Sequence, residues 1–249
     1  MKNIKFMQME IPKLLESKAW FIEKHLADLQ HPLHDKVIEL LLVSDYACRQ
    51  IQLLKTLLQD DECRSLLSRE DYFHCLQAVS FSLPQAAYFR TLRQFRNTHF
   101  LRLLLLELAD IASTAQVMRA WSDCADALIL HAINYCKLGL SRRYGVPRDE
   151  KGNEVELFTL AMGKLGGREL NYSSDIDLIF AYTVVGETDG EERIDNQHYF
   201  SRLVQQFVQT LQNVTPDGFV FRVDIRLRPN GDSGPLVSSL AAMESYYQE

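Results

Sequence analysis

The first part of the chain carries apolar residues at intervals of three and four positions, the spacing of amphipathic helices. Five segments share it and are predicted to be helical: residues 11–30, 35–58, 68–79, 84–109 and 113–140. The short sequences His31-Pro32, Ser44-Asp45-Tyr46 and Ser82-Leu83-Pro84 indicate helix starts or breaks. The pattern therefore predicts a helical region over residues 1–143.

The pattern changes at residues 145–153, a polar stretch with glycine and proline that we interpret as a connector. Beyond it, predicted strands alternate with predicted helices. Strands are expected at 155–162, 176–182 and 219–228, helices at 165–170, 195–213 and 239–248, and a turn at 230–234. The sequence thus predicts an α+β fold, with a helical region followed by a small α/β domain at residues 144–249.

Two aspartates, Asp175 and Asp177, stand at the start of the apolar run predicted as a strand. Alternate residues of a strand share a face, so these carboxylates point together while Ile176 and Leu178 face a core. Mg²⁺ prefers one or two protein carboxylates together with water and phosphate oxygens. This pair is therefore a candidate metal site for phosphoryl transfer.

A glycine-rich turn with positive charge precedes the aspartates and contains Gly163, Lys164, Gly166, Gly167 and Arg168. Glycines let peptide N–H groups approach a phosphate closely. The spacing does not fit the phosphate loop G-x-x-x-x-G-K-[ST], and it does not fit the dinucleotide fingerprint G-x-G-x-x-G. The turn is a candidate phosphate site of another type.

A second charged block lies within the strand predicted at 219–228. If this segment is extended, Arg222, Asp224, Arg226 and Arg228 share one face and the apolar residues share the other. A solvated ladder of salt bridges is one interpretation. The other is a metal-binding aspartate beside guanidinium groups that bind phosphate, which the earlier aspartate pair favours.

Residues 163–180 resemble the nucleotidyltransferase superfamily pattern, in which a glycine turn is followed by Asp-hydrophobic-Asp-hydrophobic. Within that superfamily they resemble the bacterial glutamine-synthetase adenylyltransferase/adenylyl-removing enzymes. Lys164 departs from the pattern, because the superfamily usually has Gly or Ser there. Residues 217–229 resemble the later strand that carries the third acidic residue, which implies that role for Asp224.

The resemblance implies a nucleotidyltransferase-type domain with a mixed sheet, in which Asp175, Asp177 and Asp224 are catalytic and hold Mg²⁺ or Mn²⁺. It also implies a set of nucleotide and phosphate contacts: Gly163, Lys164, Gly166, Gly167, Ser174, Arg226 and Arg228. For Ser173 and Ser174, a local role in capping and orienting the turn is at least as well supported by the residues themselves.

Members of this family carry two related catalytic halves on one chain. The long helical segment before the motif, the sequence Asn171-Tyr172-Ser173-Ser174, and residues 232–249 resemble the N-terminal, AMP-removing half. This implies phosphorolysis of adenylylated glutamine synthetase with orthophosphate, releasing ADP, and a PII-type signalling protein as partner of the full-length enzyme. Because Glu249 falls inside a predicted helix, we expect the chain to be a fragment.

Three alternatives remain open at this point. The forward reaction, which transfers AMP from ATP to glutamine synthetase, uses a similar constellation of residues. Uridylyl transfer to a PII-type protein shares the Asp-x-Asp motif, but Lys164-Leu165-Gly166-Gly167 fits that family less well. The third alternative is a regulatory or scaffolding fragment with an idle site.

Composition and charge narrow the range of partners and compartments. The net charge is −6, from 27 basic and 33 acidic residues, so no nucleic-acid partner is indicated. The leucine run at 103–106 is far too short to cross a bilayer, and residues 1–6 lack the apolar core of a secretion signal. Five scattered cysteines without a C-x-x-C motif suggest neither disulfides nor a zinc site. We expect a cytoplasmic protein without a membrane partner.

A run of arginines, Arg90, Arg93, Arg96 and Arg102, marks the helix predicted at 84–109. We interpret it as a solvated or salt-bridging face, because surface ion pairs specify little. Contact with a substrate protein or with adenylate is the alternative.

Overall fold

The computed structural model describes residues 16–27, 30–59 and 61–248, without the side chains of Asp61 and Glu62. The outer parts of the helix predicted at 11–30, the chain start and Glu249 lie outside the described residues. The chain forms two compact units. We call them the helical unit, within residues 1–66 and 97–117, and the sheet unit, within residues 67–96 and 118–249.

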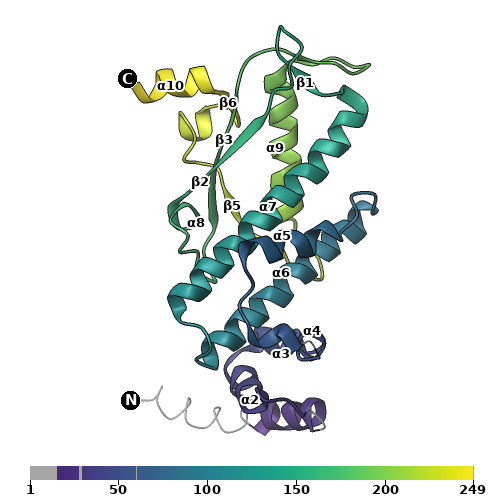
Figure 1. Ribbon diagram of the computed structural model, residues 1–249, viewed down its shortest axis with the longest axis vertical. Coiled ribbons are helices and arrows are strands. Elements are labelled where there is room, and N and C mark those ends of the chain that lie inside the picture. Colours follow the sequence, from purple (N-terminus) through teal and green to yellow (C-terminus); the bar gives the residue numbers. More distant parts are fainter. Residues whose placement is uncertain (1–15, 28–29, 60, 249) are drawn as a thin grey trace, which may run out of the picture. The chain divides into compact units, whose positions relative to one another are not determined.

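A four-stranded sheet organises the sheet unit (Figure 1). Its central strand β3, Ile176–Tyr182, pairs antiparallel with β2, Leu157–Met162. On its other side β3 pairs in parallel with β5, Val223–Asp224, and farther along with β6, Ser238–Ser239. The predicted α+β class and mixed sheet are therefore confirmed.

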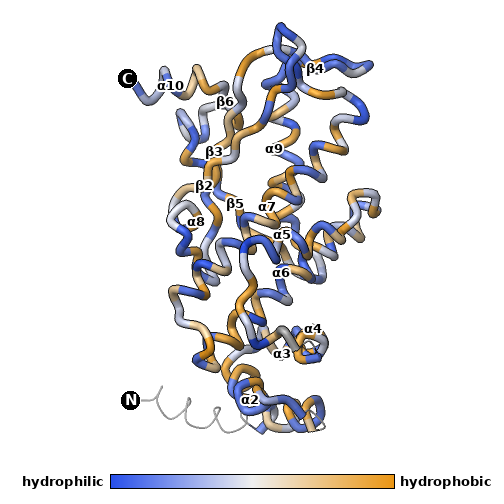
Figure 2. Tube along the Cα trace, viewed as in Figure 1, coloured by the Kyte–Doolittle hydropathy of each residue, from blue (hydrophilic) through white to orange (hydrophobic). Residues whose placement is uncertain are grey.

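Strand β3 is buried on both faces, which explains its nearly continuous apolar sequence (Figure 2). One face packs on helix α9, Asn196–Gln212, where the ring of Phe180 lies 5.7 Å from that of Phe207. The opposite face carries Ile179, which packs with Met243 of helix α10, Leu240–Gln248. The sheet is thus held between two helices of different length.

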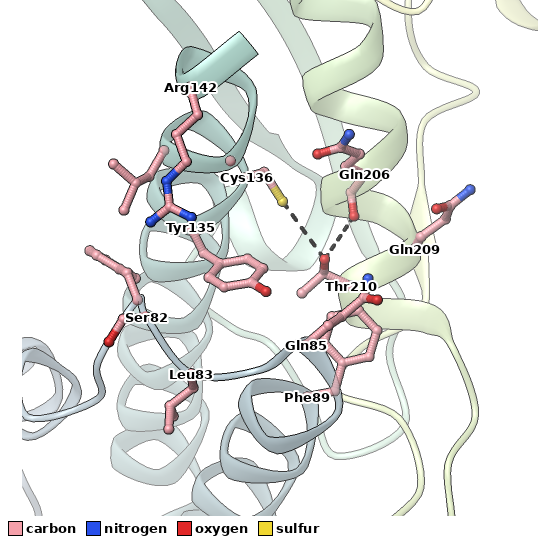
Figure 3. Close-up of a pocket in the computed structure, with 13 residues that line it drawn as sticks. Ser82, Leu83, Gln85, Phe89, Tyr135, Cys136, Arg142, Gln206, Gln209 and Thr210 are labelled. Atoms are coloured by element: carbon pink, nitrogen blue, oxygen red, sulfur yellow. Dashed lines mark hydrogen bonds between the residues drawn. The ribbon is translucent and has the colours of Figure 1, made fainter.

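Three more helices contribute residues to the sheet unit. Helix α5 spans Arg69–Gln77, α6 spans Gln85–Leu108 and α7 spans Thr114–Tyr144, and the last two also contribute to the helical unit. The predicted break at 82–84 is confirmed, because α6 begins directly after Pro84. Side chains join α7 to α9 through Cys136 Sγ and Thr210 Oγ1, 3.7 Å apart (Figure 3).

The change from helices to strands lies where it was predicted, since α7 ends at Tyr144 and a short strand β1, Pro147–Arg148, follows. This strand pairs with β4, Glu187–Thr188, a small ladder that the sequence did not indicate. Residues 67–96 and most of α7 belong to the sheet unit. Residue 143 therefore marks a change of secondary structure, and the compact unit with the sheet begins earlier in the chain.

The strand predicted at 219–228 is wrong over most of its length. Only Val223 and Asp224 form ladder bonds, and residues 226–230 make turns followed by a 3₁₀ helix at Gly231–Ser233. The predicted helix at 165–170 is also displaced, because helix α8 spans Gly163–Gly166. Both differences lie beside the candidate site and change which side chains can reach it.

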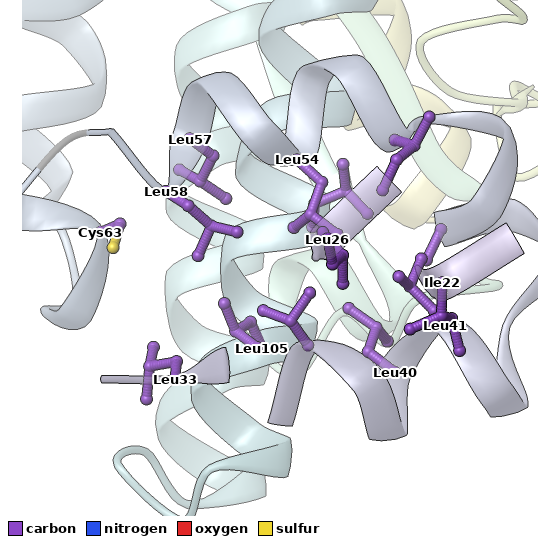
Figure 4. Packing of buried hydrophobic residues seen from close by; sticks show 14 residues of the cluster. Ile22, Leu26, Leu33, Leu40, Leu41, Leu54, Leu57, Leu58, Cys63 and Leu105 are labelled. Atoms are coloured by element: carbon purple, nitrogen blue, oxygen red, sulfur yellow. The ribbon is translucent and has the colours of Figure 1, made fainter. Parts of the chain in front are cut away.

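The helical unit buries an apolar cluster that includes Leu26, Leu41, Leu54 and Leu105 (Figure 4). Residues 16–26 are helical, and the single helix predicted at 35–58 is divided into three: α2, His34–Val43; α3, Asp45–Arg49; and α4, Ile51–Leu57. A 3₁₀ turn at Asp61–Arg64 follows. The predicted start near Ser44 is confirmed, because its side chain accepts a hydrogen bond from Ala47 N.

The interpretation of the arginine run as a solvated face is wrong for two of its members. Arg93 is fully buried and donates to the backbone oxygens of Thr210 and Gly218 at 3.2 and 2.9 Å. Arg102 is also buried and donates to Ser65 O at 3.1 Å. Both guanidinium groups are bound to backbone carbonyl oxygens inside the protein, so these side chains are structural.

None of the described helices combines the length and apolar character that crossing a bilayer requires. All five cysteines are free, in agreement with the prediction of no disulfide framework.

Candidate functional site

Two of the three predicted acidic residues stand side by side on neighbouring strands. In the parallel pairing of β3 with β5, Asp177 is the register partner of Asp224. Adjacent strands lie about 4.8 Å apart, so the two carboxylates share one small region of the sheet. Asp175 comes just before β3 and contributes its charge to the same region, since it raises the pKa of Asp177. The structure therefore gathers all three acids at one end of β3.

The pKa values of Asp177 and Asp224 are shifted in opposite directions. Burial, followed by the charges of Asp224 and Asp175, raises the pKa of Asp177. Hydrogen bonds from Arg226 lower the pKa of Asp224. Arg226 and Lys164 compensate the charge of Asp177 only in part, whereas the charge of Asp224 is paired directly with Arg226.

The arginines of the second block play three different roles. Arg226 lies beside Asp224, where its Nε donates at 2.9 and 3.0 Å and its backbone N donates at 2.8 Å. Arg222 places Nε 2.5 Å from Asp175 Oδ1. Arg228 is buried and braces the turn after β5 by donating to Ile225 O at 2.7 Å. The prediction that all three arginines share a strand face with Asp224 is therefore wrong, because the strand ends at Asp224.

The glycine turn closes over the acids at Gly163. This residue has φ of +52°, and a Cβ atom there would lie 2.4 Å from Asp177 Oδ2. Gly166 is equally constrained, because its Cβ would lie 2.4 Å from Ala161 O. Any side chain at either position would displace a neighbour, so the glycines allow the turn to approach Asp177 and β2 closely.

Lys164 extends from this turn to the serine pair, and its Nζ donates to Ser174 Oγ at 3.1 Å. Ser174 Oγ in turn donates to Asn171 Oδ1 at 2.6 Å, and Ser173 N donates to the same oxygen at 3.2 Å. The local, turn-forming role of the serines therefore has direct support. Asn171 is the centre of this turn, and its position two residues before Ser173 is the signal that could have identified it.

Arg168 anchors the glycine turn to helix α7. Its backbone adopts φ of +57°, and its guanidinium forms an ion pair with Asp123 and lies 3.4 Å from Asp126 Oδ2. Two residues later, Leu170 N donates to Ser122 Oγ at 3.1 Å. The sequence placed Arg168 among the charges facing phosphate, but here it is committed to α7. Asp123 and Asp126 could not be recognised from the sequence, because they lie more than forty residues away.

The three aspartates offer carboxylate oxygens to a cation, but Asp175 and Asp224 already form ion pairs with arginines. Among the residues that the structure describes, no group of three or more His, Cys, Asp or Glu side chains is arranged to hold a metal ion. Arg222 and Arg226 hold Asp175 and Asp224 in the arrangement seen here. Asp177, beside Asp224, forms no ion pair of its own in the described structure, and hard carboxylate oxygens are the donors that Mg²⁺ prefers.

Comparison with known proteins gives a consistent result. The model of a family described as glutamate-ammonia ligase adenylyltransferase matches residues 38–249. The chain is similar to a bifunctional glutamine synthetase adenylyltransferase/adenylyl-removing enzyme of Mannheimia haemolytica, with 48% identity over 161 residues, 64% of this chain and 17% of the relative.

Proteins with the same description from two other bacteria are also similar. The relative from Shewanella woodyi is 43% identical over 211 residues, which cover 83% of this chain and 22% of the relative. The relative from Thioalkalivibrio sulfidiphilus is 42% identical over 203 residues, which cover 81% and 21%. The chain therefore spans about a fifth of the length of these curated relatives.

Proposed function

The chain belongs to the glutamate-ammonia ligase adenylyltransferase family, and we propose that it carries the site that removes AMP from the adenylylated tyrosine of glutamine synthetase. In this reaction an oxygen of orthophosphate bonds to the adenylyl phosphorus and the bond to the tyrosyl oxygen breaks. The products are ADP and a free tyrosine hydroxyl group, which takes up a proton. The observation that carries the proposal is the register pairing of Asp177 with Asp224, next to the glycine turn.

The residues of the chain supply positioning and charge. The backbone of Gly163, Gly166 and Gly167 lets phosphate oxygens approach, while Lys164 and Arg226 contribute positive charge. Lys164 Nζ is held by Ser174, and Arg226 is held by Asp224, so both cations are oriented before substrate arrives. In phosphoryl transfer, orientation and neutralisation of developing charge provide most of the catalysis.

The acidic residues fit a divalent cation, most simply Mg²⁺ or Mn²⁺. The fit rests on Asp177, the register partner of Asp224. Burial, followed by the charges of Asp224 and Asp175, raises the pKa of Asp177, and a bound cation would relieve the repulsion between these carboxylates. Asp175 and Asp224 would complete the site after exchanging their contacts with Arg222 and Arg226. A metal bound there would neutralise the phosphate oxygens on which negative charge develops.

The test compares the two directions of the reaction in the same preparation. The chain is incubated with Mg²⁺, orthophosphate and adenylylated glutamine synthetase, and release of ADP is measured. In parallel, it is incubated with Mg²⁺, ATP and unmodified glutamine synthetase, and transfer of AMP is measured. We expect ADP release, with loss of at least about a hundredfold in Asp177→Asn, the scale on which removal of a charged catalytic group acts. Transfer of AMP without ADP release would instead support the forward reaction.

A control variant separates the site from general effects of charge removal. Asp232 is exposed and lies 3.8 Å from Arg228 in the turn behind β5, so Asp232→Asn should retain ADP release. Binding of Mn²⁺, followed by paramagnetic resonance without substrate, should weaken in Asp177→Asn and Asp224→Asn and stay unchanged in Asp232→Asn. Full ADP release or unchanged Mn²⁺ affinity in Asp177→Asn would contradict the assignment.

A further inference from the structure

A cavity of about 490 Å³ lies between helices α6, α7 and α9, within the sheet unit and lined by residues that the acidic site does not use (Figure 3). This volume is in the range of small-molecule sites, roughly 300–1,000 Å³. The lining includes one cationic side chain, Arg142, and contains no Asp, Glu or Lys. The cavity is therefore suited to a ligand that carries negative charge.

Four of the polar side chains around this cavity have no hydrogen-bond or ion-pair partner among the described residues. Arg142 forms no ion pair or hydrogen bond with any described residue, whereas its neighbour Arg143 is paired with Glu192 at 2.6 Å. The side-chain amides of Gln85, Gln206 and Gln209 also line the cavity, and none of them hydrogen-bonds to another described residue. One guanidinium and three carboxamides thus present free donors and acceptors to the same space.

An aromatic surface lies among these groups. The ring of Tyr135 stacks on that of Tyr88, with centroids 3.7 Å apart and planes inclined by 8°. Tyr88 does not line the cavity but Tyr135 does, so Tyr135 is supported from behind and offers its remaining surface to the cavity. Figure 3 shows the guanidinium of Arg142 extending toward the Tyr135 ring. A planar ligand placed on this ring would bring its anionic end near Arg142.

We propose that this cavity binds a mononucleotide, with the base on Tyr135, its polar edge on the glutamine amides and its phosphate on Arg142. Each contact follows from the chemistry of the groups. Bases stack on aromatic rings, carboxamides match the donor and acceptor pattern of base edges, and guanidinium binds phosphate oxygens through two donors. A cationic ligand is disfavoured by Arg142, and an apolar ligand would leave the amides unpaired. This site is separate from the acidic site and does not depend on the proposed function.

The test measures binding of AMP to the chain by calorimetry in the presence of a chelator, in the Asp177→Asn background so that the acidic site contributes least. We expect saturable binding that Arg142→Gln weakens at least about tenfold, the loss typical of a charge-assisted hydrogen bond. Arg143→Gln is the matched control, because the adjacent guanidinium pairs with Glu192 and lies outside the lining. It should leave AMP affinity unchanged.

Two further ligands test how the nucleotide is recognised. Adenosine lacks the phosphate, so it should bind to the unaltered cavity more weakly than AMP does. For the same reason, its affinity should be the same for the unaltered chain and for Arg142→Gln. Ribose 5-phosphate should bind more weakly than AMP, because it lacks the base, and Tyr135→Leu should remove that difference. The proposal is overturned if AMP does not bind, if Arg142→Gln and Arg143→Gln bind it equally, or if ribose 5-phosphate binds as tightly as AMP.

Discussion

Replacement of Asp177 by Asn is expected to stabilise the folded chain at neutral pH, although it removes a residue proposed to be catalytic. The folded state raises the pKa of Asp177 above its ordinary value of 3.8, so ionisation of this carboxyl group costs free energy in the folded protein. This cost is absent below the ordinary pKa and is complete above the raised pKa. The gain in stability from Asp177→Asn should therefore appear as the pH rises and disappear in acid.

Burial is the largest cause of the raised pKa of Asp177, and the repulsion by Asp224, the next cause, gives a scale for the free energy. At the strand separation of about 4.8 Å, two unit charges repel by about 1 kcal/mol in a water-like dielectric and by about 3.5 kcal/mol at an effective dielectric of 20. Asp177 is partly exposed, and Arg226 and Lys164 offset part of the repulsion, so the lower figure applies. A gain of about 1 kcal/mol raises the midpoint of thermal unfolding by about 2–4 °C in a domain of this size.

Asp224→Asn is the control, because it has the opposite expected sign. Arg226 lowers the pKa of Asp224, so its charge stabilises the fold above pH 3.8 and this contribution is lost as the pH falls through the lowered pKa. Urea unfolding of both variants at pH 7 and pH 3 would measure the two differences. The reasoning is refuted if Asp177→Asn destabilises the chain at pH 7, or if its gain persists unchanged at pH 3.

Three further predictions concern the surroundings of the acids. Arg168→Gln removes the cation paired with Asp123, while Asp126 keeps its ion pair with Arg69. The substitution should cost about 1–3 kcal/mol in urea unfolding and lower the rate of ADP release, whereas an unchanged rate would show that the anchor is dispensable. Gly163→Ala should abolish ADP release, because the new Cβ atom would collide with the Asp177 carboxylate. Gly152→Ala is the control, since Gly152 also has a positive φ but no atom within 4 Å of the added Cβ, and this variant should retain activity. Ser68→Ala removes the capping box of α5 and should cost about 1 kcal/mol in thermal unfolding with no change in kinetics, so a kinetic defect would count against a purely structural role.

The sequence predicted best those features that are encoded by neighbouring residues. Strand β3 was predicted with its observed limits, because its apolar run and the flanking aspartates are local signals. The helix start after Pro84 and the cap at Ser44 were equally local. The spacing of Asp175 and Asp177 indicated acids at the start of β3, and the family resemblance indicated that Asp224 would join them. The register of β3 and β5 places Asp177 beside Asp224.

Features that depend on distant partners were missed. Arg93 is indistinguishable from a surface arginine by sequence, since the carbonyl groups that it binds lie 117 and 125 residues away. The same applies to Arg168 and its partners on α7. The strand at 219–228 failed for a related reason. Alternation predicts a strand only where a neighbouring strand offers ladder partners, and β3 supplies them only at Val223 and Asp224.

The early end of β5 explains why the two paired acids are not equivalent. Since the chain turns directly after Asp224, the backbone N and the guanidinium of Arg226 both return to that carboxylate. Strand β3 continues for five residues beyond Asp177, so no following residue can turn back in the same way. The carboxyl group of Asp177 therefore depends on something outside β3 for neutralisation, and the fold leaves Gly163, which has no side chain, directly against it. A short strand beside a long one thus produces one acid stabilised by its own chain and one available to a ligand.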